Sequence, residues 1–222
     1  MRIYRDVGGV LGLHLATNAF SEEIESSLQN ETVLIAPLEK KRSSKNSGFF
    51  SVKPDVEGPV KFVNRLDHWP DIIFRMCNLI RDCGLYPELI TPDFCFGNTY
   101  PSKTGFNNHA DSMYRWGDSV VGISLNAPCT ICFAPKKGTF AQQNVFSSCP
   151  NVRHLKNGTV EVELPQRSIY IMSGDSRNGK KWKHGIKKGM DTGIRRSLTL
   201  RSTKVFFNEC LKRELTLTNT SP

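Results

Sequence analysis

Two short polar segments carry side chains from which this chain can build a metal site. Residues 106–111 read Phe-Asn-Asn-His-Ala-Asp, which places His109 and Asp111 two positions apart. In an extended segment such residues point to the same face, so this imidazole and this carboxylate can reach one metal ion. His184, from a different segment, would complete a 2-His-1-carboxylate set, which holds Fe(II) with positions open for a co-substrate and O₂.

A His-x-Asp pattern alone is weak, because many chains of this length contain one by accident. The other histidines, His14, His68 and His154, lie in segments without matching polar companions. Taken by itself, His184 would be an ordinary polar histidine. The case for it as the third ligand depends on the segment that follows it.

That segment, residues 195–201, reads Arg-Arg-Ser-Leu-Thr-Leu-Arg. In a strand, Leu198 and Leu200 would pack in a core, and the opposite face would be polar with an arginine at each end. This polar face comprises Arg195, Ser197, Thr199 and Arg201. Buried arginines need partners, and a dicarboxylate suits them because guanidinium groups bind carboxylates through two parallel hydrogen bonds. A solvent-facing basic strand fits this motif equally well.

Period-two apolar patterns predict the strands that would position these residues. They lie at 94–96, 120–125, 130–133, 160–164, 168–172 and 198–205, and Asn157-Gly158 predicts a hairpin turn. A helix is expected to begin at Pro70 and end at Gly84, and a shorter one to span 21–29. The buried face of the longer helix would carry Ile73, Met76, Cys77 and Ile80.

These elements predict an α+β, mainly β fold: a double-stranded β-helix (jelly-roll) core with an N-terminal helical layer and lid. We expect residues 1–90 to form the N-terminal extension, lid and supporting helix. Residues 91–210 would form the core and 211–222 a C-terminal tail. The basic segment 40–47, followed by Phe49 and Phe50, is a candidate for the lid.

The net charge of +9 over 222 residues is concentrated in one block. Between Arg167 and Lys204, eleven Lys and Arg residues stand against two acidic residues, whereas the rest of the chain is balanced. Such a block fits a polyanionic partner, RNA or single-stranded DNA, although a solubilising surface is the alternative. Seven cysteines without disulfide-framework spacing favour an intracellular setting, cytoplasm or nucleus, with a viral origin left open. No membrane span is expected, and we expect a monomer.

The order and spacing of four motifs resemble the AlkB family of Fe(II)/2-oxoglutarate dioxygenases. The motifs are Asn98-Thr99-Tyr100, His109-x-Asp111, His184 and the Arg-x-Ser-Leu-Thr-Leu-Arg run, within residues 94–204. Residues 174–177, Gly-Asp-Ser-Arg, also resemble the Gly-Glu-Ser-Arg that family members often carry. The Arg-x-Ser form is similar to AlkB-like domains of plant RNA viruses, since cellular members commonly have asparagine where Ser197 stands.

The resemblance implies roles for individual residues. His109, Asp111 and His184 would bind iron. Asn98 and Tyr100 would hydrogen-bond 2-oxoglutarate. Its distal carboxylate would meet Arg195, and Arg201 would lie near its iron-binding end beside Asp111. Ser197 and Thr199 would line the same co-substrate face.

The implied reaction is oxidative demethylation of N-alkylated bases in RNA or single-stranded DNA. It uses Fe(II), 2-oxoglutarate and O₂, and releases formaldehyde, succinate and CO₂. A hydroxylase of a tRNA base or a protein side chain is an alternative, as is a nucleic-acid-binding relative that has lost catalysis. The paired arginines and the basic block argue against a protein hydroxylase, because prolyl-hydroxylase-like enzymes typically hold the distal carboxylate with one basic residue.

Substrate contacts are less well defined by the sequence. An aromatic residue of the lid could stack on the base, with Phe49, Phe50 and Trp69 as candidates. Met113 stands where some family members carry an acidic residue that contacts the base, and Tyr114 and Trp116 could line the pocket. Lysines near His184 are expected to contact phosphates; they are Lys180, Lys181, Lys183, Lys187 and Lys188.

Overall fold

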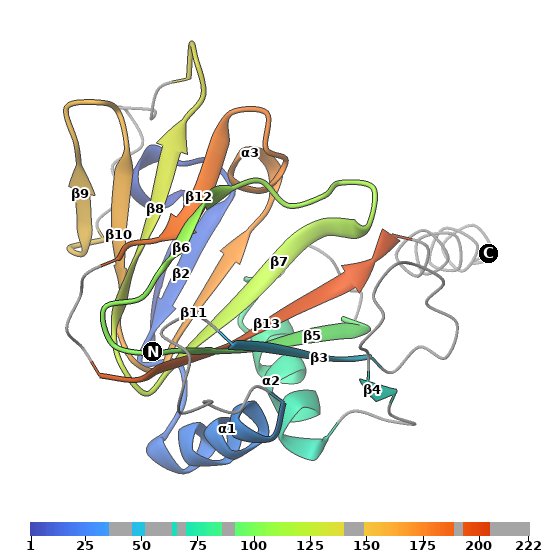
Figure 1. Ribbon diagram of the computed structural model, residues 1–222. Coiled ribbons are helices and arrows are strands. Elements are labelled where there is room, and N and C mark those ends of the chain that lie inside the picture. Colours follow the sequence, from blue (N-terminus) through green and yellow to red (C-terminus); the bar gives the residue numbers. More distant parts are fainter. Residues whose placement is uncertain are drawn as a thin grey trace, which may run out of the picture.

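Two β-sheets face one another in the computed structural model, which describes residues 1–35, 46–51, 64–65, 70–85, 92–139, 149–188 and 193–204 (Figure 1). The major sheet contains β1 (Arg2–Tyr4), β2 (Leu13–Thr17), β3 (Asn46–Ser51), β4 (Asn64–Arg65), β5 (Phe94–Tyr100), β7 (Trp116–Leu125), β11 (Ser168–Met172) and β13 (Arg195–Thr203). The minor sheet contains β6 (Phe106–His109), β8 (Cys129–Pro135), β9 (Val152–His154), β10 (Val160–Leu164) and β12 (Trp182–Ile186).

The strand order is that of a jelly roll. It runs β1-β2-β11-β7-β13-β5-β3-β4 in the major sheet and β6-β12-β8-β10-β9 in the minor sheet. Among the described strands, β3 and β4 pair in parallel and the other pairs are antiparallel. The predicted fold class is therefore confirmed.

Alternation along the strands builds two apolar layers. Between the sheets, Leu13 and Leu15 of β2 pack with Ile131 and Phe133 of β8. On the other side of the major sheet, side chains such as Leu198 pack against the helices. One face of each central strand of the major sheet thus points to the other sheet, and its opposite face points to the helices.

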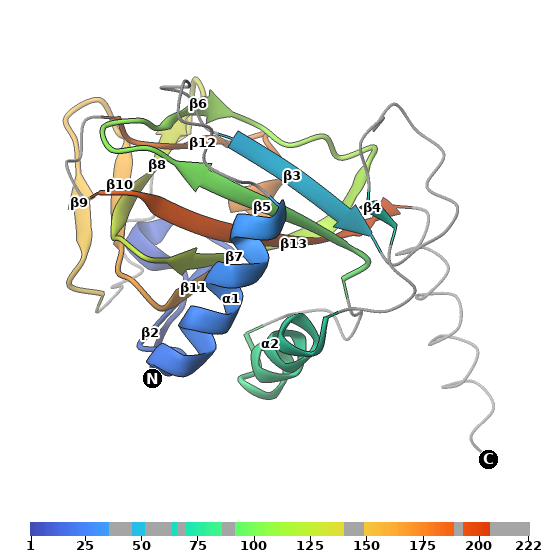
Figure 2. The ribbon, with the colours of Figure 1, turned by 60° about the horizontal axis from the view of Figure 1, so that its bottom comes forward.

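Two helices, α1 (Glu22–Ile35) and α2 (Asp71–Asp82), cover the outer face of the major sheet (Figure 2). The four apolar residues predicted to face the core from α2 are buried, and Gly84 adopts a left-handed φ of 60° just after the helix. A short helix, α3 (Gly174–Arg177), precedes β12, and the 3₁₀ turn η1 (Val7–Gly9) lies between β1 and β2. No helix in the described part of the chain is long and apolar enough to cross a bilayer.

The predicted strands are present, with β13 beginning at Arg195, three residues before the expected start. Its extra residues are ordered because β13 pairs with β5 on one side and β7 on the other. The described residues among the first 90 also supply strands β1 to β4 to the major sheet. Trp69, most of the expected lid segment and the C-terminal tail lie outside the described residues.

Candidate active site

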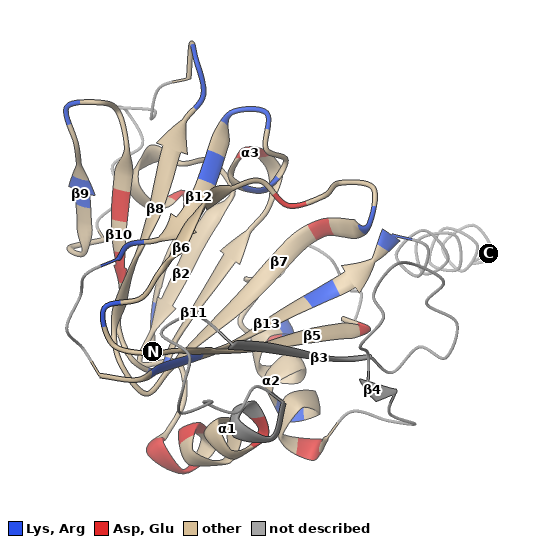
Figure 3. Cartoon of the chain, in the orientation of Figure 1, with Lys and Arg blue, Asp and Glu red and all other residues tan. Residues whose placement is uncertain are grey.

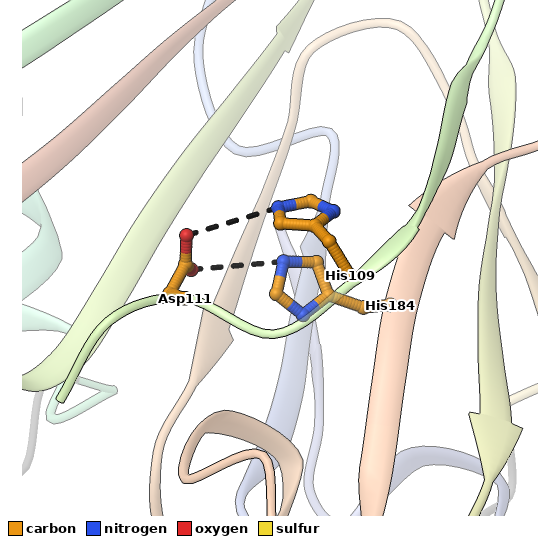
Figure 4. A group of neighbouring side chains, drawn as sticks. All are labelled: His109, Asp111 and His184. Carbon is orange, nitrogen blue, oxygen red and sulfur yellow. Dashed lines mark ion pairs between the residues drawn. The ribbon is translucent and has the colours of Figure 1, made fainter.

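The two histidines of the predicted metal set lie directly opposite each other on neighbouring strands. His109 of β6 and His184 of β12 are register partners in the minor sheet, and their ring centroids are 4.4 Å apart. Asp111 follows in the loop after β6, so its carboxylate turns back toward both rings (Figure 4). One ligand atom from each residue can be chosen so that the three lie within 4.8 Å of one another. The fold thus brings together residues that are 73 positions apart in the sequence (111 and 184).

The protonation of these groups suits a divalent cation. His109 Nδ1 lies 3.1 Å from the carbonyl oxygen of Asn107; a carbonyl only accepts, so Nδ1 carries the proton and Nε2 is free to coordinate. Burial lowers the pKa of His184 to about 3, against the opposing charge of Asp111, so its ring is neutral at physiological pH. Asp111 Oδ2 is buried and has no hydrogen-bond partner among the described residues. These donors fit Fe(II), which would give that oxygen its partner.

Arg201 holds the other oxygen of the carboxylate. Its guanidinium lies 2.8 Å from Asp111 Oδ1 and is packed over the rings of Phe96 and Trp116, at 4.9 and 5.3 Å from their centroids. Burial would raise the pKa of Asp111, but Arg201 and His184 together lower it to about 2. Arg201 therefore keeps Asp111 ionised and fixes its orientation.

A cavity of about 550 Å³ extends from the histidines along β13. Arg195 and Ser197 are register partners of Tyr100 and Asn98 on β5. Asn98 Nδ2 donates to Ser197 Oγ at 3.5 Å. All six predicted co-substrate residues line the cavity: Asn98, Tyr100, Arg195, Ser197, Thr199 and Arg201.

The six residues form a co-substrate row along the cavity. Arg195 is the buried cation at the end of this row that is far from the histidines. It lies over the Tyr100 ring, 5.0 Å from the centroid, and its Nη2 donates a hydrogen bond to Ser124 Oγ at 3.5 Å. Its Nε and Nη1 are buried without an acceptor among the described residues. A buried guanidinium with unmet donors is unfavourable unless a ligand meets them, and a carboxylate does so best.

The residues expected to contact the substrate do not all line the cavity. Trp116 lines the cavity, but Tyr114 is 95% exposed and does not. Met113 is held by Arg177, whose Nη1 lies 3.2 Å from its sulfur. The backbone of β3 pairs Phe49 with Phe96 and Phe50 with Cys95, while the side chains of Phe49 and Phe50 lie outside the described residues.

The expected phosphate contacts also lie away from the cavity. Lys181 pairs with Asp175 at 2.6 Å. Lys183 is exposed and precedes His184 on β12, so it points from the opposite face of the minor sheet. Lys187 is paired with Glu161 at 2.7 Å on that outer face. None of these three lysines lines the cavity.

Sequence reasoning missed Arg177, although it flagged the Gly-Asp-Ser-Arg motif that contains it. This side chain is 1% exposed and donates to the carbonyl oxygens of Asp111, Ser112 and Gly117 at 3.4–3.5 Å. It therefore fixes the loop that presents the carboxylate of Asp111. The motif was the available signal, but only the fold shows which loop the arginine reaches.

Tyr170 was missed as well. It lies in the cavity opposite Gly122, its register partner on β7. A Cβ at Gly122 would lie 2.0 Å from Cζ of the Tyr170 ring, so only glycine leaves room for it. The signal was a glycine inside a buried strand, which often marks a close approach. Two further lining residues, Phe106 and Arg115, give no sequence signal that separates them from ordinary exposed positions.

The 2OG-Fe(II) oxygenase superfamily matches residues 57–205, a stretch that contains the triad, the cavity and β13. The chain belongs to this superfamily. Its members use Fe(II), 2-oxoglutarate and O₂, so the chain is a dioxygenase, and the resemblance to AlkB-like members is confirmed.

Three proteins illustrate the relationship. The chain is 32% identical over 95 residues to the Xenopus tropicalis tRNA (carboxymethyluridine(34)-5-O)-methyltransferase alkbh8, covering 43% of this chain and 12% of that protein. It is 31% identical over 112 residues to the Arabidopsis thaliana alkylated DNA repair protein ALKBH8 homolog, covering 45% and 30%. The structure of OsALKBH1 has the same fold, with a TM-score of 0.57 at 14% identity, covering 86% and 98%. The chain thus spans less than a third of the length of either curated relative.

Proposed function

We propose that this dioxygenase oxidises a carbon substituent on a base of RNA or single-stranded DNA, with oxidative demethylation as the outcome when that carbon is an N-methyl group. His109, Asp111 and His184 would hold the iron, and Arg195 would bind the distal carboxylate of 2-oxoglutarate. The observation that carries this proposal is the single cavity that contains both the His-Asp-His set and the unmet donors of Arg195.

The chemistry follows from that pairing. Iron with 2-oxoglutarate and O₂ converts a C–H bond to C–OH, while the co-substrate becomes succinate and CO₂. An N–CH₂OH product then loses formaldehyde and leaves N–H. The chain's own residues hold and orient the reactants. The guanidinium of Arg201 holds Asp111 at 2.8 Å. On one face of β13 lie the side chains that would bind the co-substrate.

A base is a suitable substrate for the open part of the cavity. Phe106 and His109 lie there with ring centroids 4.5 Å apart, and both side chains are partly exposed. Such rings can stack on a base that has left its helix, and a single strand offers that base at the lowest cost. The names of these two relatives, which concern tRNA and alkylated DNA, support nucleic acid as the substrate class.

A second candidate function is hydroxylation of a tRNA base at a substituent that is not lost. The name of the Xenopus relative, a tRNA methyltransferase, supports tRNA as the substrate, and the charge of the cavity favours a substituent that is not cationic. Among the described lining residues Asp111 is the only carboxylate, whereas Arg115, Arg195 and Arg201 are cationic. Cationic bases such as 1-methyladenine would find little compensation there, and a neutral or acidic substituent would be better placed.

Mass spectrometry of modified oligonucleotides tests both functions. The panel contains 1-methyladenine and 3-methylcytosine in RNA and DNA, and a tRNA anticodon arm with a carboxymethylated uridine, each with Fe(II) and 2-oxoglutarate. Demethylation removes the methyl mass and releases formaldehyde, whereas hydroxylation adds one oxygen. Either product should be absent with Asp111→Ala. If no base changes while 2-oxoglutarate is turned over, the proposal is wrong.

A further inference from the structure

Six exposed lysines gather at one end of the minor sheet, on its turns and at the start of β12 (Figure 3). The turns follow β8, connect β9 to β10, and precede β12. We call this group the lysine end; it comprises Lys136, Lys137, Lys156, Lys180, Lys181 and Lys183.

The backbone holds these turns side by side. The strands β12, β8 and β10 are consecutive in the minor sheet. The backbone N–H of Lys136 donates to the carbonyl oxygen of Lys181 at 2.8 Å, and a Cβ at Gly158 would lie 3.2 Å from Pro135. Neighbouring strands are about 4.8 Å apart, so the positive charge is spread over a width of about 10 Å.

The charge of the lysine end is largely uncompensated. Lys181 forms an ion pair with Asp175, and within the described residues the other five lysines form none. By contrast, the outer face of the same sheet pairs Lys187 and Arg153 with Glu161. Like charges this close repel one another, and a polyanion that neutralises several of them is the partner they favour.

The lysine end also adjoins the metal-binding loop. A Cβ at Gly179 would lie 2.6 Å from the Cβ of Ala110, which sits between His109 and Asp111. His184 of β12 follows Lys181 by three residues, about 10 Å in an extended chain. A chain of phosphates on these lysines would therefore run beside the residues that hold the iron.

We propose that the lysine end binds the phosphate backbone of the single-stranded nucleic acid whose base enters the active site. That a base enters the active site rests on the proposed function. Binding of the phosphate backbone is measured separately from base oxidation. The ammonium groups would act as point charges on phosphates, which gives affinity and position without sequence preference. The surface differs from the six-residue co-substrate row and from the cavity mouth at Phe106 and Arg115.

The test compares two double charge reversals. Lys136→Glu/Lys137→Glu alters the lysine end, and Arg2→Glu/Arg75→Glu is the matched control. Arg2 of β1 and Arg75 of α2 are exposed, belong to the major sheet and to the helix on its outer face, and do not line the cavity. Binding of a fluorescent single-stranded RNA is followed by anisotropy at several salt concentrations, with wild type alongside.

We expect the lysine-end variant to bind at least about 10-fold more weakly near 0.1 M salt. The slope of log affinity against log salt should also fall by about 1.4 in magnitude, for two lost phosphate contacts on a single strand. The control should change affinity less than about 2-fold, because it alters the net charge equally but elsewhere. Succinate formation without nucleic acid should be the same in all three proteins.

Equal weakening in both variants, or none in the lysine-end variant, would overturn the proposal. If the lysine-end variant binds RNA as tightly as wild type, an acidic protein would be the remaining partner for this surface. If the lysine-end variant loses RNA binding as expected but the wild type oxidises no base, the surface assignment stands and the proposed function fails. If wild type and variant bind equally and both oxidise bases, the function stands and the surface assignment fails.

Discussion

At the scale of single residues, the site is electrostatically incomplete without a ligand. One oxygen of Asp111 accepts from Arg201, and the other is buried, 3.6 Å from His184 Nε2, and has no hydrogen-bond partner among the described residues. Two donors of Arg195, at the far end of the cavity, likewise have no acceptor in the described part of the chain. A cation bound by Asp111 Oδ2 and a carboxylate bound by Arg195 would satisfy both buried groups.

The metal assignment predicts a large loss of affinity on removing a ligand. His109→Ala or Asp111→Ala should lower Mn(II) or anaerobic Fe(II) affinity at least about 100-fold, since removing even a supporting contact typically costs 10- to 100-fold. Calorimetric titration measures this loss. His154→Ala is the control, an exposed histidine on β9 that should bind metal as wild type does. Unchanged binding in Asp111→Ala would remove it from the metal site.

Arg195→Gln should raise the Kd for 2-oxoglutarate about 10- to 100-fold, because a hydrogen bond to a charged group contributes about 1.5–3 kcal/mol. The measurement is a titration in the presence of Mn(II). Arg196→Gln is a matched control, since Arg196 is the next residue of β13, on the opposite face, and does not line the cavity. Equal effects of the two substitutions would show that Arg195 has no specific role.

Part of this site could be predicted from residue types alone. The alternation at 195–201 was sufficient to place four side chains on one face, because it requires only local strand geometry. Arg177 and Tyr170 could not be assigned in the same way. Their roles depend on the carbonyl oxygens of a distant loop and on a glycine of a neighbouring strand, which no local pattern encodes.

At the scale of elements, the loop between β6 and β7 must be rigid if Asp111 is to meet both histidines. Arg177, just before β12, provides the tie by donating to the carbonyl oxygens of residues 111, 112 and 117. The guanidinium spans several acceptors at once, which the single ammonium of lysine cannot do. Arg177 thus fixes the loop and β12 to each other.

Arg177→Lys should therefore weaken metal binding about 10- to 100-fold while the fold is retained. The readout is the rise in Tm that Mn(II) produces, which should shrink because linked stabilisation depends on metal affinity. Arg153→Lys, an exposed arginine on β9 paired with Glu161, should leave the rise unchanged. A lower Tm with an undiminished metal-induced rise would mean that Arg177 supports only the fold.

The contact between β7 and β11 gives an independent prediction. Gly122→Ala should lower the free energy of unfolding by about 1–3 kcal/mol, because the new methyl overlaps the Tyr170 ring. In a Tyr170→Ala background the same substitution should cost less than about 0.5 kcal/mol, since the ring is gone. Denaturant unfolding of the four proteins in this cycle gives the coupling energy. Additive effects would contradict the packing described.

Several elements of the fold could also be predicted, because their signals are local. The helix α2 has an apolar face, and β10 and β11 coincide with their predicted ranges. The place of β2 within the major sheet could not, since it depends on pairing with β11 more than 150 residues away. The opposition of His109 and His184 likewise comes from the register of β6 and β12, which sequence spacing does not specify.

At the scale of the whole molecule, the basic block divides into parts with different surroundings. Arg177 and Arg195 are buried, and Arg201 is mostly buried against Asp111. Lys187 is neutralised by Glu161, whereas Lys180 and Lys183, which belong to the lysine end, are exposed and form no ion pair within the described residues. A sequence count of charge thus indicates a polyanionic partner but not where it would bind.

The coupling between co-substrate turnover and base oxidation tests the proposed function most directly. Succinate and modified base are quantified in the same reaction, with wild type and Asp111→Ala, with and without the modified oligonucleotide. We predict that the oligonucleotide accelerates succinate formation, that one succinate appears per oxidised base, and that both disappear in Asp111→Ala. Succinate formed at the same rate with and without the oligonucleotide, and no change in any base, would contradict the proposed function.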